Sequence, residues 1–234
     1  MHTLVTMLMR TAGWFKGLRW RTRNGWPLIE GGRGEPVLVL VHGFAVDSGA
    51  MFSLACRLAK NHRVLALDLP GFGEHAIDDP SIVDLDWFVA ALGGFLENEQ
   101  LDNVVLVGAS MGGAICATFA AEHPNRVLGC CLISPAGIEP PILDEILIQA
   151  KAGENGFRMD TVEDFEHMMA LNFASPPKLP RFIKQGLAAR AIELADQHET
   201  ILRSMGETLL GGAEVRLPAI RCPVSIVWGE RDEI

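Results

Sequence analysis

Short apolar runs recur along the chain and alternate with segments of helical periodicity. These runs predict β-strands at Pro36–Val41, Arg63–Leu67, Val104–Val107, Val127–Ile133 and Val224–Trp228. They do not alternate between apolar and polar residues, and such continuous strands are expected where helices cover both faces of a parallel sheet. The pattern therefore predicts an α/β protein with a doubly wound, mostly parallel sheet and right-handed crossovers.

Helical patterns fill the intervals between these strands. An apolar stripe from Leu85 to Leu96 predicts one helix, with Ser81 and Asp84 as the capping box that opens it. A second helix is expected over Met111–His123, because Pro124 cannot continue it.

One interval, from residue 134 to residue 223, is about 90 residues long and contains no convincing strand. Thr161 and Asp164 predict a capping box inside it, and residues 183–205 are largely helical in pattern. We expect a helical cap over the sheet. The predicted domains are a basic and aromatic lead-in (1–25), the first part of the core (26–135), the cap (136–217) and the last part of the core (218–234).

Charge is distributed unevenly along the chain. The net charge is −9, which argues against a nucleic-acid binder, yet the first 29 residues hold five basic residues and no acidic one. Aromatic residues are interleaved with these cations. Two interpretations stay open, namely a peripheral membrane contact or a solvated lead-in to the first strands. The expected location is the cytoplasm, with or without that peripheral contact. The residues concerned are Arg10, Trp14, Phe15, Lys16, Arg19, Trp20, Arg21, Arg23 and Trp26.

Composition gives further limits. Hydrophobic residues make up 49% and charged residues 21%, as in a globular protein. The five cysteines have no metal-like spacing and are expected as buried free thiols in a reducing compartment. Cys130 and Cys131 are adjacent in a predicted strand, so they should face opposite sides of the sheet. No metal and no organic cofactor is implied.

The string Gly108-Ala109-Ser110-Met111-Gly112 joins a predicted strand to a predicted helix. In that context the G-x-S-x-G pattern indicates a sharp turn that raises a serine nucleophile above the carboxyl edge of the sheet. Small neighbours are needed because the turn is so tight. Ser110 is therefore the candidate nucleophile.

Two further loops carry candidate chemistry. His42-Gly43-Phe44 ends a predicted strand, and the backbone N–H groups of Phe44 and Met111 are the candidate oxyanion hole. The imidazole of His42 is expected to brace this loop. Asp232 follows the last predicted strand at the position of a triad acid, with Glu230 as the second choice.

The ordered strings VLVHGF, LDLPGFGE, LVGASMGG, EHPNRV, LISPAG and VSIVWGERD resemble the α/β-hydrolase superfamily from about residue 26 onward. Within it, HGFAVDSGAMF, SMGG, SPAG and the cap pattern are similar to monoacylglycerol-lipase-like serine esterases. The resemblance implies Ser110 as nucleophile, Phe44 and Met111 as oxyanion donors, and Asp232 as acid.

The same resemblance implies a catalytic histidine that follows the acid. All seven histidines precede Asp232, so we expect the chain to be truncated at its C-terminal end and inactive as 234 residues. Val224–Trp228 would then form an apolar sheet edge. His75 is the first substitute base to consider, whereas His167 and His198 are expected on cap helices.

The function predicted for the full-length protein is hydrolysis of a small-molecule or lipid ester through an acyl-enzyme. The apolar cap predicts a medium or long acyl group, with Met168 and Phe173 as contacts. Two alternatives remain: a carbon–carbon bond hydrolase of the same fold, and a non-catalytic binding protein.

Overall fold

A seven-stranded sheet forms the centre of the computed structural model, which describes residues 2–138 and 156–232. The strand order is β1-β2-β4-β3-β5-β6-β7. The strands from β4 to β7 in this order run parallel, whereas β1 and β2 are antiparallel. Their bounds are β1 Leu18–Arg23, β2 Trp26–Gly31, β3 Leu38–Val41, β4 Val64–Leu67, β5 Val104–Ala109, β6 Val127–Ile133 and β7 Val224–Val227. The predicted mostly parallel sheet is confirmed.

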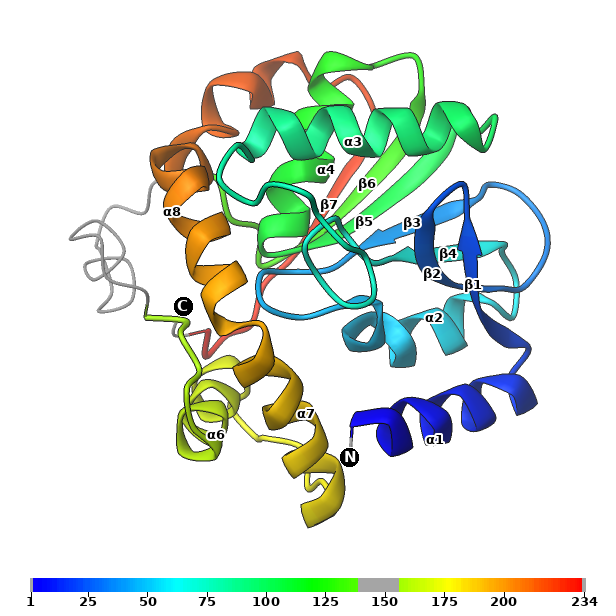
Figure 1. Cartoon of the computed structure of the whole chain (residues 1–234). Helices are drawn as coiled ribbons and strands as arrows, with labels where there is room; N and C mark the ends of the chain where they lie inside the picture. Colours follow the sequence, from blue (N-terminus) through cyan, green and yellow to red (C-terminus); the bar gives the residue numbers. More distant parts are fainter. Residues whose placement is uncertain (1, 139–155, 233–234) are drawn as a thin grey trace.

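Helices cover both faces of this sheet (Figure 1). The α-helices are α1 His2–Phe15, α2 Phe52–Leu58, α3 Leu85–Asn98, α4 Met111–Glu122, α6 Val162–Asn172, α7 Arg181–Glu193 and α8 Ala195–Gly211. Two short 3-10 helices are η1 Ser48–Met51 and η2 Glu214–Ala219. Helices α3 and α4 lie against one face, and α2 lies on the other.

The central strands are buried on both faces, as their continuous apolar pattern predicted. In β3, Val39 and Val41 belong to the core under α3 and α4, whereas Leu38 and Leu40 belong to the core on the α2 side. Cys130 likewise packs into the first core, while its neighbour Cys131 packs against the second. The expectation that these two thiols face opposite sides of the sheet is confirmed.

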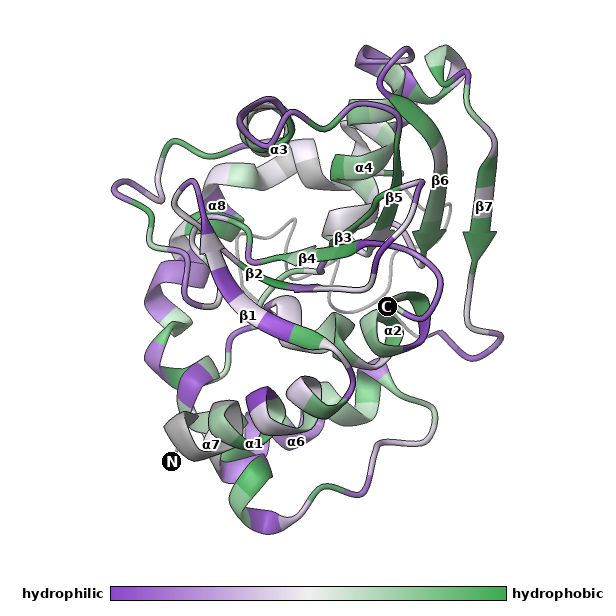
Figure 2. Cartoon of the chain, turned by 90° about the vertical axis from the view of Figure 1, so that its right-hand side faces the viewer, coloured by the Kyte–Doolittle hydropathy of each residue, from purple (hydrophilic) through white to green (hydrophobic). Residues whose placement is uncertain are grey.

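Strand β7 differs from the other parallel strands because it forms an edge of the sheet in the described part of the chain. All four of its residues are exposed, although the strand is apolar apart from Ser225. Its partner is β6, in parallel register from Cys130↔Val224 to Ile133↔Val227. Figure 2 shows this apolar strand at the rim of the sheet.

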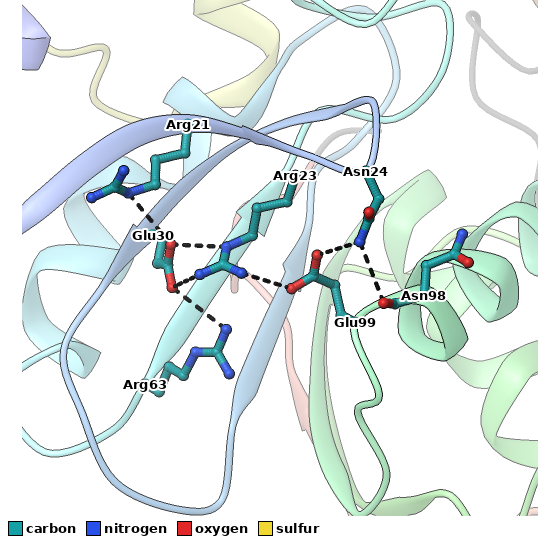
Figure 3. A network of polar contacts seen from close by, with 7 residues as sticks. All are labelled: Arg21, Arg23, Asn24, Glu30, Arg63, Asn98 and Glu99. Carbon is teal, nitrogen blue, oxygen red and sulfur yellow. Dashed lines mark hydrogen bonds and ion pairs between the residues drawn. The ribbon is translucent and has the colours of Figure 1, made fainter.

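The hairpin of β1 and β2 was not predicted from the sequence, and β1 lies within the predicted lead-in. An ion-pair network fastens it to the core (Figure 3). Arg23 donates to both carboxylate oxygens of Glu30 at 2.9 and 3.0 Å and to Glu99 beyond the end of α3 at 3.0 Å. Arg21 and Arg63 lie 3.7 and 3.5 Å from the same Glu30 carboxylate. Arg21 and Arg23 of β1 thus form ion pairs with carboxylates of neighbouring segments instead of packing into a hydrophobic core.

The structure confirms one predicted capping box and corrects the other. Thr161 and Asp164 form the reciprocal box that opens α6. Helix α3, however, begins at Leu85, and the Asp84 carboxylate caps it by accepting the Trp87 N–H at 2.7 Å. Ser81 donates instead to Asp79 at 2.5 Å. The prediction with Ser81 was wrong because a carboxylate next to the helix start is itself an efficient N-cap.

The predicted cap region contains α6, α7 and α8 in its described part. Two side chains fasten α7 and α8 to the loop that follows β4. The Arg190 guanidinium donates to the Gly73 carbonyl and the Gln197 amide to the Gly71 carbonyl, both at 2.6 Å. This loop lies at the carboxyl end of the parallel strands, so these helices stand next to the edge that carries Ser110 (Figure 1).

Candidate active site

Ser110 occupies the sharp turn between β5 and α4. Its backbone has φ 49° and ψ −119°, a conformation that non-glycine residues rarely adopt. Hydrogen bonds hold the turn in place: the Ser110 N–H donates to the Ile133 carbonyl at 2.9 Å, and the Ser110 carbonyl accepts from Ala136 N–H at 3.0 Å. The surrounding backbone therefore stabilises the strained residue, and the predicted sharp turn is present.

The small residues around Ser110 are explained by close backbone approaches. A Cβ at Gly108 would lie 2.3 Å from the Gly112 carbonyl oxygen, and one at Gly112 would lie 2.3 Å from the Val41 carbonyl oxygen. Both carbonyl oxygens belong to the backbone of the sheet or the turn. They cannot shift to make room for a methyl group without a large cost in free energy. The glycines thus let α4 approach β3 and β5 closely enough to form the turn.

Gly112→Ala is therefore expected to destabilise the protein by about 3 kcal/mol or more, since the added methyl group overlaps backbone atoms. Gly94→Ala is the matched control, because a Cβ at Gly94 in α3 meets nothing within 4 Å. That change should be neutral or stabilising by up to about 1 kcal/mol. Urea unfolding of both variants checks the prediction, and equal stabilities would contradict it.

The loop after β3 passes directly beside Ser110. A Cβ at Gly43 would lie 3.3 Å from the Ser110 Cβ and 3.9 Å from its Oγ. Phe44 follows, and Met111 begins α4, whose helix dipole favours negative charge at this end. The structure thus brings the Phe44 segment, Ser110 and Met111 together. Their use as an oxyanion hole stays a prediction.

His42 braces this loop, as its expected structural role requires. Its ring is fully buried and its Nε2 accepts the Leu69 N–H at 3.0 Å. Since Nε2 is an acceptor, Nδ1 carries the proton and donates to the Gly43 carbonyl at 2.7 Å. Burial lowers the pKa of His42, which keeps the ring neutral. Both nitrogens are occupied, so His42 joins the loops after β3 and β4.

Asp232 lies on the same edge of the sheet, two strands from Ser110. The Ser134 hydroxyl, just after β6, donates to the Asp232 carboxylate. The Ser134 N–H donates to the Val227 carbonyl at the end of β7 at 2.8 Å. Segment 134–136 therefore contacts both the Ser110 turn and the candidate acid. Sequence reasoning assigned no role to Ser134, and the only signal was its place directly after a predicted strand.

His198 is a second residue that the sequence did not single out for this site. It projects from α8 and stacks on Phe72, with ring centroids 4.9 Å apart and an interplanar angle of 26°. Its ring lies 5.8 Å from that of Phe44. Burial, together with nearby His42 and Arg190, lowers its pKa to about 4, so the ring is neutral. Helix α8 thereby contributes to the packing around the Gly43-Phe44 loop.

The remaining candidate residues, His75, Met168 and Phe173, make their contacts outside the Ser110 cluster. His75 Nδ1 bonds to the Asp68 carbonyl at 2.8 Å, and its ring packs on Trp26. In the described part of the chain no histidine forms a hydrogen bond with Ser110. Met168 is buried in α6 and Phe173, at the end of that helix, is exposed. No group of three or more potential metal ligands occurs among the described residues.

The arrangement of turn, loop and sheet is matched by known proteins. The model of the alpha/beta hydrolase family matches residues 38–234, and the chain belongs to that family. Monoacylglycerol lipase abhd6-B of Xenopus laevis is 27% identical over 213 residues, which is 86% of this chain and 62% of that protein. The chain thus spans less than two thirds of the length of this lipase.

Two other relatives widen the comparison. An acetyltransferase component of the acetoin cleaving system of Pseudomonas putida is 32% identical, over 87% of this chain and 54% of that protein. The solved structure of a membrane phospholipase A superposes with a TM-score of 0.90 at 30% identity, covering 99% of this chain and 76% of the other.

Proposed function

We propose that the full-length protein is a serine hydrolase that cleaves carboxylic esters, with lipid esters such as monoacylglycerols as the substrate class. The observation that supports this most is the strained Ser110 turn beside the Gly43-Phe44 loop. The lipase and phospholipase relatives support an ester as the substrate.

In the proposed reaction Ser110 Oγ attacks the ester carbonyl carbon while a general base takes its proton. Negative charge then develops on the carbonyl oxygen. The N–H groups of Phe44 and Met111 would stabilise it, each contributing about 3–4 kcal/mol in the transition state. The alcohol leaves with the proton from the base. Water then hydrolyses the acyl-enzyme by the same steps, and Ser110 is regenerated.

The general base remains to be assigned, because no histidine among the described residues forms a hydrogen bond with Ser110. Both nitrogens of His42 are bonded elsewhere, and His75 packs against Trp26. We therefore propose that residues 1–234 alone have little esterase activity. If residues 1–234 retain any esterase activity, the His75→Ala variant tests whether His75 is the substitute base. Unchanged activity in this variant excludes His75.

The two rival functions are distinguished by substrate. The protein is tested on p-nitrophenyl butyrate, on a monoacylglycerol and on a vinylogous diketone, with mass spectrometry of the quenched reaction. Ester turnover with an acyl group on Ser110 is the expected result. Cleavage of the diketone alone would favour a carbon–carbon bond hydrolase, and no turnover of any substrate by the full-length protein would favour a binding protein.

The cap is proposed to select the acyl chain through Met168 and Phe173. Met168→Ala and Phe173→Ala are each expected to lower kcat/KM for a long acyl ester by about 10-fold, because a few methylene contacts are lost. Turnover of p-nitrophenyl acetate should change less than about twofold. A panel of p-nitrophenyl esters of increasing length checks this. Equal losses on short and long esters would show that these residues only stabilise the fold.

A further inference from the structure

Helix α1 has an apolar face that points into solvent. Large side chains on it are strongly exposed: Met7 by 65%, Leu8 by 44%, Trp14 by 58% and Phe15 by 77%. With Thr11 and Ala12 they occupy roughly 160° of the helix circumference, at about 100° per residue. No charged residue falls in this arc, and the Thr11 hydroxyl is bonded to the Met7 carbonyl. An exposed apolar face of this kind marks an interaction surface.

The opposite side of α1 is fastened to the body of the protein. Arg10 donates to both carboxylate oxygens of Glu74 at 2.9 and 3.1 Å. Gly13 lies so close to Trp20 that a Cβ there would meet its ring at 2.6 Å. Helix α1 also packs against α7 of the cap. The exposed face is therefore held in a fixed orientation relative to the cap.

Cations flank the two exposed aromatic rings. Lys16 directly follows Phe15, and the Arg19 guanidinium lies 5.4 Å from the centre of the Trp14 ring. Among the described residues, no carboxylate forms an ion pair with either cation. Arg21 and Arg23, in contrast, lie near Glu30 within the hairpin network (Figure 3). Arg19 Nη1 donates to the Trp14 and Leu18 carbonyls at 3.1 and 2.9 Å. The Lys16 ammonium and the other N–H groups of Arg19 are the donors that this face offers to anionic groups, on a chain whose net charge is −9.

The exposed face of α1 lies at the same end of the molecule as the helices of the predicted cap. Helices α1, α6 and α7 lie at one end of the molecule in both views (Figures 1 and 2). Two exposed aromatic side chains of the cap, Phe173 after α6 and Phe182 in α7, belong to the same end. No helix in the described ranges is long and apolar enough to span a bilayer. A helix of this kind binds in the headgroup plane, with aromatic residues inserted and cations on anionic lipids.

We propose that the exposed face of α1, with Lys16 and Arg19 beside it, docks the protein on an anionic lipid bilayer. Met7, Leu8, Trp14 and Phe15 insert at the level of the headgroups. Docking in this orientation brings α7 and the cap to the lipid surface. The binding depends only on α1 and the two cations beside it, whereas its use in supplying an ester to Ser110 rests on the proposed function.

Vesicle flotation tests the docking. The full chain is mixed with vesicles of phosphatidylcholine containing phosphatidylglycerol, and Trp14→Ser combined with Phe15→Ser is expected to lower the partition coefficient about tenfold or more. Lys16→Glu combined with Arg19→Glu should remove the preference for anionic over pure phosphatidylcholine vesicles. Raising the salt concentration should weaken binding of the unmodified chain but not of this charge variant. Circular dichroism verifies that the variants are folded.

Exposed apolar residues elsewhere provide matched controls. Ile82→Ser combined with Val215→Ser removes two exposed side chains outside α1 and should leave the partition coefficient unchanged. The β7 edge is the competing surface, so Ile226→Ser combined with Trp228→Ser is measured as well. Loss of binding in that variant with retention in the α1 variant would overturn the proposal. A dimer that the α1 substitutions dissociate, without any vesicle binding, would assign the face to a second copy of the chain.

A separate readout distinguishes this proposal from the proposed function. Flotation is repeated with Ser110→Ala, which should bind vesicles as the unmodified protein does. In the full-length protein, Trp14→Ser combined with Phe15→Ser should leave the rate of hydrolysis of a soluble short ester unchanged. The same variant should hydrolyse vesicle lipid about tenfold more slowly than the unmodified protein. Vesicle binding by the full-length protein without ester hydrolysis would contradict the proposed function alone. Hydrolysis without α1-dependent binding would contradict the docking alone.

Discussion

Ser110→Ala is expected to lower ester hydrolysis by the full-length protein by about 10⁴-fold or more and to abolish labelling by a fluorophosphonate probe. The reason is that the acyl-enzyme cannot form without the hydroxyl, so only binding and the oxyanion hole contribute to the remaining rate. The turn itself should persist, since the hydrogen bonds that hold it involve backbone atoms. Initial rates on p-nitrophenyl butyrate and gel fluorescence of the probe give the two measurements.

Ser53→Ala is the control for this experiment, because Ser53 is an exposed serine on α2. It should keep both the rate and the labelling. Hydrolysis that survives in Ser110→Ala would place the nucleophile elsewhere. Labelling of the unmodified protein at a residue other than Ser110, identified by peptide mass spectrometry, would have the same meaning.

Asp232→Asn is expected to reduce kcat of the full-length protein by about 10⁴-fold, with little change in the temperature of unfolding. An amide has nearly the same shape but lacks the charge that orients and stabilises a protonated base. The fold should tolerate the change because Asp232 is exposed. Its contact with the Ser134 hydroxyl can persist, since an amide oxygen also accepts a hydrogen bond. Steady-state kinetics and calorimetry measure the two effects.

Glu230→Gln serves as the comparison, since Glu230 was the second choice for the acid. It should change kcat by less than about threefold, as for an exposed residue outside the chemistry. A large loss in Glu230→Gln together with a normal rate in Asp232→Asn would reverse the assignment of the acid.

Except for the Ser81 capping box, the patterns named here that depend on neighbours in sequence predicted the structure correctly. The strands from β3 to β6 follow from continuous apolar runs, because a strand buried on both faces needs no polar position. The Ser110 turn follows from glycines at fixed spacing, because only a hydrogen side chain fits against the backbone of β3 and β5. The Thr161 capping box also lies within four residues.

Contacts between distant residues were not predictable in the same way. The hairpin of β1 and β2 turns at Asn24 and Gly25, a local signal that the sequence analysis missed, whereas the ion pair that ties it to Glu99 joins residues 76 positions apart. The partner of Asp232 is Ser134, 98 residues away, and the partners of His198 are rings from the loops after β3 and β4. No local periodicity records such pairs.

The sequence by itself determined the fold class, the sharp turn at Ser110 and the place of the Gly43-Phe44 loop beside it. Each depends on residue types at short, fixed spacing. The tertiary structure alone decided which cations of the basic N-terminal stretch are paired within the protein. Arg23 is taken up by the carboxylates of Glu30 and Glu99, whereas Lys16 and Arg19 stay beside exposed aromatic rings. Which charges a protein presents to a partner depends on which ones its own carboxylates have already paired, and that is fixed only when distant segments meet.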